Sequence, residues 1–148
     1  MTIGWDFDNT YSKLPKSFLE NIKPVPVKDP KLIILNKNLA EQLNLDFSKF
    51  SDTDLAKIFS GNSLPEGSET IAQAYAGHQF GHFTMLGDGR AVMLGEHLDK
   101  ENKRFDIQFK GSGRTSFSRS GDGRAVLGPM LREYIISEAI HALNIHTT

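Results

Sequence analysis

A strictly alternating segment, residues 104–110, is the feature that most constrains the fold of this chain. Phe105, Ile107 and Phe109 fall on one side of an extended backbone, and polar or charged side chains occupy the positions between them. A period of two is the pattern of a β-strand with one buried face. Lys110 therefore ends the predicted strand on its polar face, where a lysine taken alone is most commonly just solvated.

Two short β-like runs lie upstream, at residues 83–86 and 91–94, and flank the sequence Gly-Asp-Gly-Arg at residues 87–90. Glycines permit the positive φ angles of a tight turn, so we predict a β-hairpin with its turn at 87–90. Residues 121–126 repeat the same sequence, Gly-Asp-Gly-Arg-Ala-Val. The repeat is too short for a solenoid, and we interpret it as one local arrangement used twice, a glycine-flanked aspartate beside an arginine.

A helix is predicted after the second repeat. Pro129 suits the first turn of a helix, and apolar positions continue through Ile136 and Ile140 to about Leu143. Glu133 lies on this apolar stripe. A glutamate near the start of a helix also complements the helix dipole, so Glu133 by itself has a purely structural interpretation.

The first part of the chain has the character of an irregular arm interrupted by turn residues. Residues 36–45 and 52–59 each place apolar side chains on one helical face, which predicts two short helices. Residues 23–30 contain repeated prolines, which oppose helix and favour an extended segment. We therefore expect an N-terminal extension, residues 1–70, that packs on a lobe formed by residues 71–148.

Arginine and glycine are concentrated in one stretch. All six arginines lie between Arg90 and Arg132, and eight of the thirteen glycines lie between Gly87 and Gly128. A guanidinium is a planar fork suited to phosphate oxygens, and glycine lets backbone N–H groups approach an anion closely. The stretch indicates an oligophosphate site, although composition alone fits a patch of solvated surface arginines equally well.

Charge and composition exclude several classes of partner. The net charge is -1, so the chain has no general attraction for nucleic acid or for anionic membranes, and we expect neither as a partner. The absence of cysteine excludes a disulfide framework and a thiolate metal site, and it suits a reducing cytosol. No apolar run is long enough for a membrane span or a signal peptide. We expect a cytoplasmic protein.

Spacing excludes several familiar sites. No Gly-Lys-Ser or Gly-Lys-Thr follows a glycine loop as in a Walker A motif, and no third glycine completes a dinucleotide fingerprint. His78 and His82 are four residues apart, but Gln79 stands where a zincin has glutamate, so we predict no metal ligands. The serines at residues 112–120 lack the partner order of a nucleophilic hydrolase.

The order of the remaining elements is a glycine hairpin, a strand that ends in Lys110, and a helix that carries Glu133. The same order occurs in the N-lobe of protein kinases, where a glycine loop covers the nucleotide phosphates and a strand lysine contacts them. A helix glutamate holds that lysine in place. Because hairpin, strand and helix often follow one another, the order alone is a weak signal.

The sequence within these elements is more specific. The relevant segments are Ala-Tyr-Ala-Gly-His-Gln-Phe-Gly at 74–81, Leu-Gly-Asp-Gly-Arg-Ala at 86–91, Gln-Phe-Lys-Gly-Ser-Gly-Arg-Thr at 108–115 and Leu-Arg-Glu-Tyr at 131–134. They closely resemble the selenoprotein O (YdiU) family. Leu-Pro at 14–15, Ser-Gly-Asn at 60–62 and Ile-His-Thr-Thr at 145–148 fit as well, so the resemblance spans nearly the whole chain. Small departures, Phe109 for leucine and Ser116-Phe117 for proline-tyrosine, touch no expected contact.

The resemblance implies a kinase-like pseudokinase that binds ATP in a flipped orientation and transfers AMP to Ser, Thr or Tyr hydroxyls of proteins. The implied fold class is α+β: an antiparallel sheet with an αC-type helix, preceded by the irregular helical arm and without the C-lobe. Carried over by motif, the nucleotide contacts would be Gly87, Gly89, Arg90, Lys110, Asp122 and Gly123. Glu133 would pair with Lys110 and position it. A buried γ-phosphate needs surrounding cations, which Arg90 and Lys110 can provide.

In that family the catalytic aspartate, the metal-binding residues and a redox-active C-terminal cysteine or selenocysteine lie beyond residue 148. We therefore expect an N-terminal fragment that uses ATP and Mg²⁺ only within the longer protein and is inactive by itself. A stand-alone nucleotide- or anion-binding module, an ordinary protein kinase lobe, and a protein- or nucleic-acid-binding role for the arginines remain alternatives.

Overall fold

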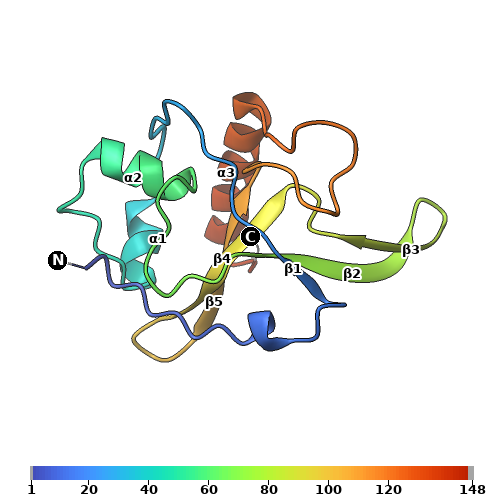
Figure 1. Ribbon diagram of the computed structural model, residues 1–148. Coiled ribbons are helices and arrows are strands. Elements are labelled where there is room, and N and C mark those ends of the chain that lie inside the picture. The colour runs from blue at the N-terminus through green and yellow to red at the C-terminus, as the bar shows by residue number, and fades with distance from the viewer. Residues whose placement is uncertain (1, 147–148) are drawn as a thin grey trace.

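The computed structural model describes residues 2–146 and has an α+β fold built on one antiparallel sheet (Figure 1). Four strands lie side by side in the order β1, β2, β4, β5, and β3 pairs with β2 only. Their bounds are β1 Leu19–Asn21, β2 Ile71–Gln79, β3 His82–Gly87, β4 Ala91–Leu98 and β5 Arg104–Lys110. The β2–β3 ribbon projects from one end of the sheet in Figure 1.

The Gly-Asp-Gly-Arg segment at residues 87–90 is not the turn of a hairpin, so that prediction was wrong. β3 pairs with the outer half of β2, whereas β4 pairs with the start of β2 at Ile71 and with β5. The hairpin turn is made by Phe80 and Gly81, whose φ angles are 58° and 80°. Because β2 is long enough to pair with β3 along one half and with other strands along the rest, residues 87–90 form a corner between β3 and β4.

Two short helices lie in the arm, as predicted from residues 36–45 and 52–59. Helix α1 (Lys37–Gln42) begins after Asn36, whose side chain accepts a hydrogen bond from the Leu39 N–H group. Helix α2 (Asp52–Phe59) begins with a capping box between Ser51 and Asp54. These caps satisfy N–H groups that lack a partner within the helix. A 3₁₀ turn, Tyr11–Lys13, precedes β1.

The larger apolar core lies between the arm and the sheet. Its buried members come mainly from α1, α2 and the segments around them: Ile3, Ala40, Leu43, Leu45, Phe47, Leu55 and Ile58. Phe105 and Ile107 of β5 pack against this cluster, and Phe109 is buried. The alternation of β5 is thus confirmed, because its apolar side meets the arm and its polar side remains exposed.

A buried polar seam also joins the arm to β4. The Glu96 residue is only 5% exposed, and its carboxylate accepts hydrogen bonds from the Tyr11 N–H group at 2.7 Å and from the Thr10 hydroxyl at 2.7 Å. His97 is fully buried and bonds to the Asp6 N–H group and the Leu43 carbonyl. No local sequence pattern predicted this seam.

Helix α3 (Leu127–Ala142) begins two residues before Pro129 and ends at the predicted place, with Leu143 as its C-cap. None of its residues is buried, and Ile135 and Ile136 are 64% and 52% exposed. On the predicted apolar stripe Ile136 and Leu143 are exposed and Ile140 is partly buried, so the rest of residues 2–146 covers the stripe only in part. No helix in that described part of the chain has the length and apolar character needed to cross a bilayer.

Candidate functional site

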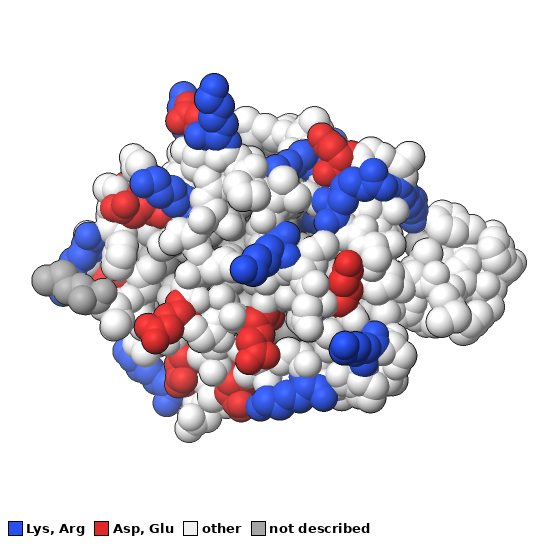
Figure 2. All heavy atoms as spheres, in the orientation of Figure 1, with Lys and Arg blue, Asp and Glu red and all other residues white. Residues whose placement is uncertain are grey.

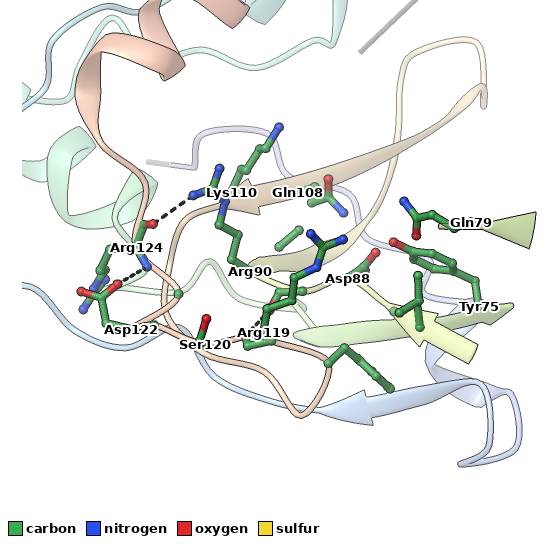
Figure 3. Close-up of a pocket in the computed structure, with 18 residues that line it drawn as sticks. Tyr75, Gln79, Asp88, Arg90, Gln108, Lys110, Arg119, Ser120, Asp122 and Arg124 are labelled. Carbon is green, nitrogen blue, oxygen red and sulfur yellow. Dashed lines mark hydrogen bonds between the residues drawn. The ribbon is translucent and has the colours of Figure 1, made fainter. Parts of the chain in front are cut away.

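A cavity of about 660 Å³ lies beside the corner between β3 and β4, the end of β5 and the loop that follows β5 (Figure 3). Cavities of this size hold small-molecule ligands. Its walls include both Gly-Asp-Gly-Arg segments. The lining contains six residues singled out from the sequence: Gly87, Gly89, Arg90, Lys110, Asp122 and Gly123. The fold thus brings together residues that are far apart in the chain.

Asp88 joins the corner at residues 87–90 to β2 through two hydrogen bonds. Its carboxylate accepts a hydrogen bond from the Gln73 N–H group at 2.9 Å, and its own N–H group donates to the Gln73 carbonyl at 2.8 Å. Burial raises the pKa of Asp88, while the Gln73 N–H group acts in the opposite direction. A Cβ at Gly87 would lie 2.3 Å from the Phe117 ring, so this position has no room for a side chain.

The loop at residues 121–124 forms the other glycine wall. The Arg124 N–H group donates to the Asp122 carboxylate at 2.9 Å, which closes a tight turn. Gly123 has a φ of 72°, and a Cβ there would lie 2.2 Å from the Gly113 carbonyl carbon. Glycine is therefore required on steric and conformational grounds.

The two arginines of the repeated segments have different surroundings. Arg90 Nη1 donates to the Arg124 carbonyl at 3.1 Å. The Arg124 guanidinium points to the arm, where it donates to the carbonyls of Val25 at 2.9 Å and Pro26 at 3.2 Å. Arg124 consequently ties the glycine loop to the arm, a role that no local sequence pattern signalled.

Lys110 and Glu133 form an ion pair between the end of β5 and the second turn of α3. Lys110 Nζ lies 2.6 Å from Glu133 Oε2, and the two side chains are 46% and 51% exposed. The hydrogen bond from Lys110 lowers the pKa of Glu133; burial opposes this shift, and the charges of Lys110, Arg90 and Arg132 lower the pKa further. Glu133 contacts Lys110 but does not itself line the cavity.

Several lining residues were not singled out from the sequence. They come from the ribbon, from β5 and from the loop after β5: Tyr75, Gln79, Leu86, Gln108, Phe117 and Arg119. The Arg119 guanidinium lies 4.9 Å from the centre of the Phe80 ring, so it joins the loop to the tip of the ribbon. Tyr75 and Gln79 belong to the segment at 74–81 that carried the family resemblance, and that was the available signal for them.

Charges of both signs are mixed over the face of the molecule in Figure 2, except on the projecting β2–β3 ribbon, which carries neither sign. Within residues 2–146, no three His, Cys, Asp or Glu side chains gather as a metal-binding group. His78 and His82 lie on the two strands of the ribbon, so the helical zincin arrangement is not formed. The described residues thus contain no ready-made group of metal ligands.

Comparison with known proteins decides the family. A family model described as "Protein adenylyltransferase SelO" matches residues 2–148. The chain belongs to the SelO family. The resemblance inferred from the sequence segments is thus confirmed, and SelO proteins are nucleotidyltransferases.

Three SelO-family relatives, each called "Protein nucleotidyltransferase YdiU", show how strong the similarity is. The chain is 77% identical over 148 residues to the Pelagibacter ubique protein, 66% over 146 residues to that of Nitrosococcus oceani, and 60% over 148 residues to that of Anoxybacillus flavithermus. The matches cover 99 to 100% of this chain and 30 to 31% of the relatives. The chain thus spans about 31% of the length of the Pelagibacter ubique relative.

Proposed function

We propose that this chain forms the ATP-binding part of a protein adenylyltransferase, which transfers AMP from ATP to Ser, Thr or Tyr hydroxyls of proteins. The observation that carries the proposal is the convergence of Arg90, Lys110 and two glycine segments on one cavity. Family membership supports the class of reaction, and the cavity supports the class of ligand.

The phosphates of ATP are the part of the ligand that this cavity suits best. Arg90 and Lys110 supply positive charge from two strand ends, and glycines at 87, 89, 121 and 123 allow close approach to backbone N–H groups. Anions bind at such backbone concavities without a dedicated side chain. With the terminal phosphates held between Arg90 and Lys110, the α-phosphate faces outward toward an incoming hydroxyl.

In the reaction we propose, the hydroxyl oxygen of a protein side chain attacks the α-phosphorus of ATP. A new P–O bond forms, the bond from the α-phosphorus to the bridging oxygen breaks, and pyrophosphate leaves. Arg90 and Lys110 stabilise the negative charge that moves to pyrophosphate. The hydroxyl proton passes to a base, for which the family resemblance suggests an aspartate beyond residue 148.

Glu133 acts in this proposal as a positioning residue. Its ion pair with Lys110 keeps the lysine at the end of β5, as the helix glutamate of a protein kinase does for the strand lysine. The order β4, β5, α3 supports a kinase-like N-lobe in residues 71–148, with residues 1–70 as its extension. Because residues 2–146 offer no group of metal ligands, we assign no step to Mg²⁺ here and propose that the chain alone is inactive.

Transfer of label tests the proposal in the full-length protein. The protein is incubated with Mg²⁺ and ATP labelled at the α- or the γ-phosphate, with Lys110→Ala as the test variant. Lys100→Ala is a matched control, because Lys100 is exposed in the turn after β4 and does not line the cavity. We expect α-label on protein in the wild type and in Lys100→Ala, and its loss in Lys110→Ala.

The other outcomes separate the alternatives. Transfer of γ-label would identify an ordinary protein kinase, and transfer of neither label alongside ATP binding would leave a binding module. Robust AMP transfer by the isolated 148-residue chain would overturn its proposed inactivity.

A further inference from the structure

We propose that the end of the cavity beneath the β2–β3 ribbon binds the adenine base, with Tyr75 stacking on the ring and the amides of Gln79 and Gln108 recognising its edge. This inference rests on the proposed function, because it assigns the second half of the same ligand.

The cavity has two chemically different ends. Figure 3 shows Asp122 and Arg124 at one end and Tyr75 and Gln79 at the other, with Lys110 and Arg90 between. Residues 74–86 of the ribbon contain no Lys, Arg, Asp or Glu. An uncharged aromatic base gains from stacking and needs no counter-ion, whereas phosphates need cations. The ribbon end is thus suited to the base and the glycine end to the phosphates.

The surface of β2 that carries Tyr75 has an opening beside the ring. Side chains alternate along a strand, so Tyr75, Gly77 and Gln79 share one face. A Cβ at Gly77 would meet no atom within 4 Å, so nothing fills the position between Tyr75 and Gln79. Tyr75 is 55% exposed, and its cross-strand neighbour Leu86 also lines the cavity. A flat ring can lie over Gly77 with Tyr75 against its face.

Two amide side chains lie around this opening. Gln108 is on the same face of β5 as Lys110, two residues away, and Gln79 ends β2. Both side chains are exposed and line the cavity, so their amides are accessible to a ligand. A glutamine amide both donates and accepts, which matches the adenine N6 amino group and N7. Guanine presents two acceptors at those positions, which an amide matches less well.

Arg119, in the loop after β5, also lines the cavity, and its guanidinium already has a partner. Its guanidinium stacks over the Phe80 ring at the tip of the ribbon. This contact holds the ribbon and the loop on either side of the opening. Arg119 therefore links the loop to the ribbon at this end of the cavity.

Calorimetric titration of the full-length protein with ATP, GTP and inorganic tripolyphosphate, all with Mg²⁺, tests the inference. Tyr75→Ala should weaken ATP binding about 10- to 100-fold and leave tripolyphosphate binding unchanged, since base stacking is the interaction removed. Tyr75→Phe should retain ATP binding. Combined replacement of Gln79 and Gln108 by alanine should lower the preference for ATP over GTP about tenfold.

Two further variants serve as controls. Phe83→Ala removes an exposed ribbon side chain that pairs with His78 on the other face, and it should bind ATP and tripolyphosphate like the wild type. Lys110→Ala should weaken the binding of both ATP and tripolyphosphate, because it acts at the phosphate end.

The outcomes distinguish this inference from the proposed function. If Tyr75→Ala binds ATP as tightly as the wild type, the base site is wrong and the proposed function stands. If Tyr75→Ala weakens the binding of ATP and of tripolyphosphate equally, the substitution distorts the cavity as a whole, and this result would also overturn the base site. Wild-type protein that binds neither ligand would overturn both proposals.

Discussion

Two ion pairs of this molecule have very different surroundings: Glu96 pairs with Arg104, and Glu133 pairs with Lys110. Glu96 is almost fully buried, and its carboxylate also accepts bonds from Thr10 and Tyr11, while Arg104 Nη1 lies 3.4 Å away. Glu133 is half exposed and has Lys110 as its one hydrogen-bond partner within the described residues 2–146. A buried carboxylate with every partner in place belongs to the fold. An exposed pair with spare hydrogen-bonding capacity can rearrange around a ligand.

The difference extends to the regions around the two pairs. The seam between the arm and β4 is closed by buried polar groups and lies next to the main apolar core. The cavity region is bordered by glycine loops, an exposed helix and a projecting ribbon. We therefore expect substitutions in the seam to affect mainly stability and substitutions around the cavity to affect mainly binding.

The largest effect on stability is expected for Glu96→Ala. The change leaves the N–H groups of Thr10 and Tyr11 and the charge of Arg104 without their common partner. Removing one member of such a buried network costs about 3 to 5 kcal/mol. Hydrogen exchange of the β4 amides in the full-length protein measures the loss. Exchange like that of the wild type would mean that Glu96 is no more structural than Glu133.

A smaller loss is expected for Gly123→Ala, which acts on the cavity wall. The added Cβ would overlap the backbone of Gly113, and alanine is strained at this positive φ, so we expect a cost of about 2 kcal/mol. Gly128→Ala is the matched control, because a Cβ there meets nothing within 4 Å, and alanine should stabilise α3 by up to about 1 kcal/mol. Thermal unfolding of both variants provides the comparison, and equal melting temperatures would contradict it.

A further effect expected in the seam is a dependence of stability on pH through Glu96. Burial raises the pKa of Glu96, but hydrogen bonds from Tyr11 and Thr10 and the charge of Arg104 outweigh it, so the pKa lies below the ordinary glutamate value of 4.5. A depressed folded-state pKa stabilises the protein above the unfolded-state value, and this stability is lost as the pH falls through the folded-state pKa. The free energy of unfolding measured with urea should thus fall below about pH 4.5, and this fall should be smaller in Glu96→Gln. An equal loss of stability at acid pH in the wild type and in Glu96→Gln would contradict this role of Glu96.

The smallest effect on stability is expected for Glu133→Gln. The side chain is half exposed and the substitution keeps its shape, so the melting temperature should stay close to that of the wild type. Binding should respond instead, with a several-fold loss of tripolyphosphate affinity as Lys110 loses its ionic partner. Calorimetry and thermal unfolding of the same samples test both expectations. A large fall in melting temperature with unchanged affinity would reverse the comparison.

Elements with strong local signals could be predicted from the sequence. β5 alternates strictly, and α2 begins with the capping residue Ser51 and carries its apolar side chains on one face. The pairing of β2 with β3 could not be predicted, because Phe80 adopts a positive φ that its residue type does not suggest. The seam at Glu96 was missed because its partners Thr10 and Tyr11 lie 86 and 85 residues away, beyond any local pattern.

For the candidate site, the family resemblance selected residues of both glycine segments together with Lys110 and Glu133, which the fold brings together. It could not reveal that Arg124 turns toward the arm, since the two Gly-Asp-Gly-Arg segments are identical in sequence. What separates Arg90 from Arg124 is the presence of the Val25 and Pro26 carbonyls beside the second segment only.

The bond between Arg124 and the Val25 carbonyl also has a consequence for the order of folding. It spans 99 residues of sequence, and Glu20 bonds to Ser116 across 96. Closing loops of this length has an entropic cost before any contact compensates for it, so such contacts form late. The hairpins can form early from neighbouring residues, but the glycine wall at residues 121–124 becomes fixed only when the arm has returned to it. Completion of the cavity is therefore among the last events as the chain reaches its native state.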